Sequence, residues 1–219
     1  MKKLLAFAVV TAATQSHAIV VDSFQVGPYD SGIVTTVGPL VTATQVGPAA
    51  SIIGGIRETK IQLTQNTLGV NGGTRMTVGG GFMAVSQSPL TDGQYSLFYG
   101  NPGNFLNLNL SSETAFRFTL AFNDLAPLRL NMRVGTNGSG ASNAVINLPV
   151  VTGHSQTVIV PFAAFAGLAS FSDVDSIRMF FDTEVAGDFV IGQIETVPEP
   201  GTMAALGLGS LALLRRKKA

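Results

Sequence analysis

Apolar and polar residues alternate with a period of two through the middle of the chain. In AFRFTLAF (residues 115–122) and LRLNMRV (residues 128–134), every second residue is apolar: Phe116, Phe118, Leu120, Phe122, Leu128, Leu130, Met132 and Val134. The residues between them include Arg117, Arg129, Asn131 and Arg133. One apolar face with this period is typical of half-buried antiparallel strands.

Shorter runs predict further strands around this central pair. The tripeptide Val-Gly-Pro begins at Val26, Val37 and Val46, and the runs beside it, 33–37 and 40–45, are rich in Val, Thr, Ile and Leu. Short β-branched runs interrupted by Gly-Pro predict strands joined by turns. We expect further strands over 144–151, 157–160, 176–182 and 188–196.

The connections between these runs support an all-β fold. Asn137-Gly138 predicts a turn, and residues 161–171 predict either one helical turn or an irregular crossover. Many short strands with frequent turns indicate an antiparallel two-sheet β-sandwich, jelly-roll-like, over residues 19–196. A short hydrophobic helix is expected at the C-terminus.

The first 18 residues have the pattern of a secretory signal peptide. Lys2 and Lys3 precede an apolar stretch, and small residues end at Ala18. We therefore expect cleavage between Ala18 and Ile19, which makes Ile19 the first residue of the exported protein.

The end of the chain joins an apolar run to a basic cluster. Residues 201–214 carry no charge, and as a helix they would extend about 21 Å, less than the roughly 30 Å of a membrane's hydrocarbon core. Arg215, Arg216, Lys217 and Lys218 follow directly. Because basic flanks stay on the cytoplasmic side, the preceding residues should lie beyond the inner membrane.

Composition excludes two classes of protein. Six of the 13 basic residues lie in the terminal segments but only one of the 13 acidic residues does, so residues 19–196 carry about −5. Nucleic-acid binding is not expected, because it needs clustered Lys and Arg. The chain has no Cys, which excludes a disulfide framework.

Acidic residues are the first candidates for chemistry. Five gather late in the chain: Asp173, Asp175, Asp182, Glu184 and Asp188. They are compatible with solvated loop ends or with a glycosidase, which needs two carboxylates across a cleft. A structural calcium ion held by Asp22 and Asp188 is a further hypothesis, since first and last strands often meet in a sandwich. No other cofactor is expected.

Aromatic residues around a Gly-Asn-Pro-Gly turn are the second candidate. Tyr95, Phe98, Tyr99 and Phe105 surround it. Tyr95 and Tyr99 would stack on sugar rings while Asn101 and Asn104 supply hydrogen bonds. The alternative is that these aromatic rings fill the core.

The C-terminal segment resembles the PEP-CTERM sorting signal of exported Gram-negative bacterial proteins. The matching parts are Val197-Pro198-Glu199-Pro200, the apolar run and the basic cluster. The resemblance implies processing by an exosortase, a membrane enzyme, after a transient stay in the inner membrane. It also implies a role in exopolysaccharide, biofilm or cell-surface assembly.

Four segments of the body resemble jelly-roll domains of such surface proteins, which are similar to carbohydrate-binding modules. These segments are 20–24, 52–58, 158–165 and 173–177. We expect a non-enzymatic cell-surface or extracellular-matrix protein that contacts polysaccharide. Self-association is also expected, since weakly charged β-edges pair readily. Two alternatives remain: a secreted carbohydrate-active enzyme and a permanently membrane-anchored surface protein.

Overall fold

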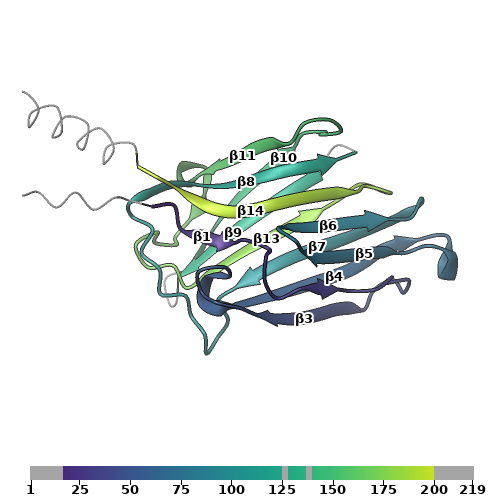
Figure 1. The fold of residues 1–219 in the computed structure, drawn as a ribbon, viewed down its shortest axis with the longest axis horizontal. Helices are drawn as coiled ribbons and strands as arrows, with labels where there is room; N and C mark the ends of the chain where they lie inside the picture. The colour runs from purple at the N-terminus through teal and green to yellow at the C-terminus, as the bar shows by residue number, and fades with distance from the viewer. Residues whose placement is uncertain (1–16, 125–127, 137–139, 200–219) are drawn as a thin grey trace, which may run out of the picture.

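Two antiparallel seven-stranded sheets form the protein (Figure 1). The computed structural model describes residues 17–124, 128–136 and 140–199. Helical structure in these ranges is limited to three 3₁₀ turns, at Ile53–Gly55, Gly69–Asn71 and Phe162–Ala164. None of the described segments is a helix of the length and apolarity needed to cross a membrane. The expected C-terminal helix and the Asn137-Gly138 turn lie outside the described residues.

Each sheet combines strands from distant parts of the chain. The first sheet has, in spatial order, β11 (Gln156–Pro161), β8 (Glu113–Asn123), β14 (Phe189–Pro198), β6 (Phe82–Gln87), β5 (Thr74–Gly79) and β2 (Tyr29–Asp30), with β1 (Val20–Asp22) also paired to β14. The second sheet has β12 (Ala166–Gly167), β10 (Gly140–Leu148), β9 (Leu128–Thr136), β13 (Ser176–Asp182), β7 (Thr91–Tyr99), β4 (Ile56–Asn66) and β3 (Leu40–Val46). The expected two-sheet sandwich is confirmed.

The alternation in β8 and β9 places apolar side chains in one core between the sheets. The predicted inward residues of β9 are all buried: Leu128, Leu130, Met132 and Val134. In β8, Phe116, Phe118 and Leu120 are buried as predicted. Phe122 is only half-buried, because its pairing with β14 shifts register between Val190 and Ile191. Such a bulge reverses the side to which later residues point, so Asn123 is buried instead.

Most of the predicted strands are present. The runs at 40–45, 144–151, 157–160, 176–182 and 188–196 correspond to β3, β10, β11, β13 and β14. The strand predicted at 33–37 is wrong, because this segment makes a single bridge, between Val34 and Thr74. Residues 161–171 contain a 3₁₀ turn followed by β12.

A buried ion pair joins the two sheets. The guanidinium group of Arg57 on β4 contacts Asp22 on β1 at 2.9 Å, and both side chains are 0% exposed. Arg57 also donates to Gln45 on β3 at 3.0 Å, and the Tyr99 hydroxyl on β7 donates to Asp22 at 2.8 Å. Burial raises the pKa of Tyr99 well above its ordinary value, so the hydroxyl keeps the proton that it donates. Burial also raises the pKa of Asp22, and Arg57 opposes that rise.

Replacing Arg57 should test this network. We expect Arg57→Leu to lower the free energy of unfolding by about 3–5 kcal/mol, because it leaves a buried carboxylate without its partner. Urea denaturation measures the loss. Adding Asp22→Asn to Arg57→Leu should recover part of it, since the unpaired charge is then gone. Arg75→Leu is the matched control: it breaks a solvent-exposed pair with Asp30 and should leave stability nearly unchanged. Equal effects at Arg57 and Arg75 would contradict a structural role for the buried pair.

Candidate functional site

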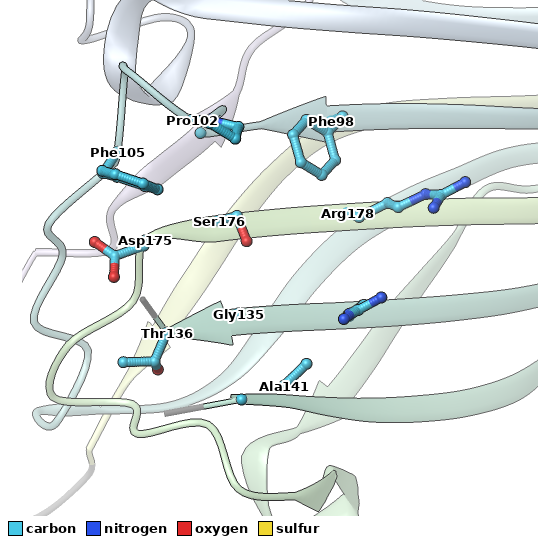
Figure 2. A pocket seen from close by; sticks show the side chains of 12 residues that line it. Phe98, Pro102, Phe105, Gly135, Thr136, Ala141, Asp175, Ser176 and Arg178 are labelled. Atoms are coloured by element: carbon cyan, nitrogen blue, oxygen red, sulfur yellow. The ribbon is translucent and has the colours of Figure 1, made fainter. Parts of the chain in front are cut away.

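The outer face of the second sheet carries a shallow pocket of about 380 Å³ at one end of β7, β9, β10 and β13 (Figure 2). Its floor is low because small residues are aligned across three strands. Ala141 on β10 lies opposite Gly135 on β9, and Gly135 lies opposite Ser176 on β13. The missing side-chain bulk leaves a depression between the larger residues on either side.

Aromatic rings and a proline border this depression. Figure 2 shows Phe98, Pro102 and Phe105 along one side, and Thr136 and Ala141 along the other. Phe98 points outward because its neighbours Leu97 and Tyr99 point into the core, as the period of a strand requires. Pro102 belongs to a tight turn in which Asn101 and Asn104 exchange backbone hydrogen bonds of 2.7 and 3.2 Å.

A second pocket, of about 250 Å³, continues from the first. It is lined by Asn131, Arg133, Asn143, Arg178 and Phe180. Arg133 and Arg178 line both pockets. We refer to the two pockets together as the groove.

One row of cross-strand neighbours crosses the groove. In it, Asn143 on β10 lies opposite Arg133 on β9, Arg133 opposite Arg178 on β13, and Arg178 opposite Phe98 on β7. The Arg178 guanidinium carbon lies 5.6 Å from the centre of the Phe180 ring, within the range of a cation–π contact. The groove therefore combines positive charge, amide groups and aromatic surface.

The groove is positively charged although the body is acidic. Lys60 and Glu58, which flank it on β4, neutralise each other at 2.6 Å. Among the described residues, neither Arg133 nor Arg178 has an ion-pair partner within 4.0 Å. None of the described residues that line the smaller pocket is a carboxylate, whereas Asp175 lines the larger one.

Asn131 leaves an acceptor unused on the floor of the smaller pocket. Its Oδ1 atom is buried, and nothing in the described ranges donates a hydrogen bond to it. Most buried polar side-chain atoms in proteins have a partner, so this Asn131 oxygen is an exception to the usual pattern.

Two of the four predicted sugar-contact residues are wrong. Tyr95 and Tyr99 are both 0% exposed. Their hydroxyl groups are used inside the protein, by Thr74 and Asp22 respectively. Both rings fill the core, the alternative reading of this cluster, because odd-numbered residues of β7 point inward.

The two asparagines and the remaining aromatics lie nearer the surface. Asn101 donates to Glu58 at 3.2 Å, and Asn104 donates to the Gly54 carbonyl at 3.4 Å. Neither lines the groove, so their contact with sugar stays a prediction. Phe98 and Phe105 do line it.

The predicted calcium site is not assembled. β1 and β14 do pair, as expected, but Asp22 lies opposite Ile194, six positions along the strand from Asp188 and hence about 20 Å away. Asp22 is committed to Arg57, while Asp188 accepts from the backbone N–H of Gln87 at 2.6 Å. In the described part of the chain, no three acidic or His side chains converge as a metal site requires.

Sequence reasoning missed most of the groove, although part of its signal was available. The alternation in residues 128–134 already placed Asn131 and Arg133 on the outward face. It did not reveal Arg178 or Asn143, because nothing in the sequence states that β9 lies between β10 and β13.

Both predicted processing positions lie beside the sandwich. The Ile19 N–H donates to the Thr196 hydroxyl at 2.8 Å, so the expected mature N-terminus lies beside β14. β14 itself continues into the predicted sorting motif through Val197 and Pro198, and Glu199 donates to the Ser112 carbonyl at 2.9 Å. Pro200 and the basic residues 215–218 lie outside the described residues. Cleavage after Ala18 stays a prediction.

Gly100 should be required for the shape of the larger pocket. It has φ +79°, and a Cβ added there would lie 2.1 Å from the Asp175 carbonyl oxygen. We expect Gly100→Ala to lower the midpoint of urea unfolding clearly, because backbone atoms cannot yield as a flexible side chain does. Gly103→Ala is the matched control, since φ is +94° but nothing lies within 4 Å. It should lose only the roughly 1–2 kcal/mol of the left-handed conformation. Equal losses in the two variants would contradict the close approach.

Comparisons with known proteins gave distant structural similarity and one sequence motif. The family 11 carbohydrate-binding module of a cellulosomal cellulase of Clostridium thermocellum has 16% identity and a TM-score of 0.45, covering 85% of this chain and 97% of its own. The family 11 module of that organism in complex with a β-1,3-1,4-mixed-linked tetrasaccharide has 17% identity and a TM-score of 0.40, covering 79% and 96%. The comparison with curated proteins found no match.

The motif is at the C-terminal end of the chain. Residues 196–218 match the PEP-CTERM protein-sorting motif, as the sequence resemblance implied. The chain thus carries a PEP-CTERM sorting motif, which indicates export and a cell-surface or extracellular location.

Proposed function

We propose that this protein is exported, processed by an exosortase at its sorting motif, and binds a polysaccharide in the groove without catalysing a reaction on it. The observation that carries the binding proposal is the groove itself, which is lined by aromatic, amide and guanidinium side chains. The sorting motif supports the proposed delivery to the cell surface.

The groove has the features of a sugar site. Binding sites generally combine apolar and aromatic lining with a few placed polar groups. Phe98, Phe105 and Phe180 supply ring surface, and the amides of Asn131 and Asn143 supply donors and acceptors for hydroxyl groups. The groove extends over four adjacent strands, which at about 4.8 Å per strand is roughly 14 Å. This length suits a chain of linked sugars rather than one ring.

Within the groove, the positions of the carboxylates favour binding over hydrolysis. A glycosidase needs two carboxyl groups about 5–9.5 Å apart. Asp175 lies just before β13 and Asp182 ends it, so an extended strand separates them by about 20 Å. Asp175 is the carboxylate that the described residues contribute to the larger pocket.

Processing can be tested by intact mass. We expect the protein recovered from an exosortase-containing Gram-negative host to lack the basic tail. The double variant Glu199→Ala, Pro200→Ala should retain it, because the enzyme would no longer recognise the motif. Arg75→Ala, far from the motif, is the control and should be processed normally. A tail retained in all three proteins would favour the membrane-anchored alternative.

Sugar binding can be tested on a panel of polysaccharides with full-length protein in mild detergent. We expect binding to at least one polymer, and Phe98→Ala should weaken it roughly tenfold because a groove wall is lost. Phe82→Ala is the matched control, since Phe82 is a partly exposed phenylalanine on the first sheet. If no polymer binds, or if the two variants behave alike, the groove is not the sugar site.

A further inference from the structure

We propose that the groove selects acidic polysaccharides, with the carboxylate of a uronic acid unit held between Arg133 and Arg178. This inference rests on the proposed sugar-binding function and adds the chemical class of the ligand. It starts from these two arginines, which have no acidic partner within 4.0 Å among the described residues.

Arg133 and Arg178 are directly opposite each other on neighbouring antiparallel strands. Residues so paired have Cβ atoms about 4.5–5.5 Å apart, and like charges in that position destabilise a sheet. Two arginine side chains therefore leave the outer face from neighbouring positions. A carboxylate between them would relieve their repulsion.

The other basic residues of the body lie beside acidic residues. Arg57, Lys60, Arg75 and Arg117 each have an acidic partner within 4.0 Å. Arg129 lies opposite Asp182 in the β9–β13 register. Over the residues placed by the structure, Arg133 and Arg178 are instead opposite one another, in a body whose net charge is about −5. The unbalanced positive charge is therefore local to the groove.

The surroundings favour a carboxylated sugar over other anions. The planar fork of a guanidinium matches a carboxylate, and Phe180 holds the Arg178 group in place through its ring. Asn131 and Asn143 flank the arginines and can bond the hydroxyl groups that a sugar carries beside its carboxylate. Nucleic acid is disfavoured, because two arginines on an acidic body cannot follow a phosphate backbone. Asp175 lines the larger pocket and not the smaller one, so the carboxylate should bind in the smaller pocket.

The test compares polygalacturonate with its fully methyl-esterified form, because the two polymers share a backbone and differ in charge. Full-length protein in mild detergent should bind polygalacturonate at least tenfold more tightly. The double variant Arg133→Gln, Arg178→Gln should lose this preference, so that its affinities for the two polymers become equal. Salt should weaken binding of polygalacturonate by the unmodified protein more than by the double variant, since exposed charges are screened.

Two controls make the result specific. Arg75→Gln and Arg117→Gln remove the same charge from the first sheet and should leave the preference intact. The double variant should have an unfolding midpoint in urea no lower than that of the unmodified protein, because the change removes a repulsion between like charges.

The outcomes separate this inference from the broader proposal. Equal binding of both polymers with no effect of the double variant would overturn acid selection and leave sugar binding in place. Binding confined to neutral polymers would do the same. If neither polymer binds and the wider panel is also silent, the proposed function itself is wrong.

Discussion

The buried pair between Arg57 and Asp22 is the constraint on which the second sheet's outer face depends. Neither side chain is exposed, so each must be satisfied inside the protein, by Gln45 and Tyr99 as well as by the other. This requirement fixes β1 of the first sheet against β3, β4 and β7 of the second. Because side chains alternate along a strand, an inward Tyr99 makes Phe98 point outward, where it becomes one wall of the groove.

Charge is also unevenly distributed over the surface, because strand pairing decides which charged residues are neighbours. Over most of the described surface, a basic residue has an acidic neighbour, as Arg117 has Glu195 and Lys60 has Glu58. The groove departs from this pattern, since β9 and β13 bring Arg133 and Arg178 together and no carboxylate is among the described residues of the smaller pocket. The processing positions are also close to each other: Ile19 bonds to Thr196, so both described ends of the chain lie beside the same strand (Figure 1).

Prediction of the strands succeeded for β8 and β9, where a long apolar face alternates with polar residues, and missed β4, β5 and β6. β9 was recognisable because its four inward residues are Leu, Met or Val. β4 gave no such pattern, because Arg57 and Thr59 occupy two of its inward positions. Sequence alone left Tyr95 and Tyr99 open between surface and core, because a tyrosine suits either face and burial depends on which sheet covers it. The segment 33–37 has strand-forming residues but finds only one bridging partner, at Thr74.

The residues alone were sufficient for features that depend on neighbours along the chain. The sorting motif, the alternation of β8 and β9 and the sandwich class all follow from local order and composition. The groove depends on contacts between residues far apart in sequence. Arg133 meets Arg178, and Asn131 meets Phe180, only because β13 pairs with β9. Strand order and burial arise from packing the whole chain around one core, so only the folded structure brings these groups into one site.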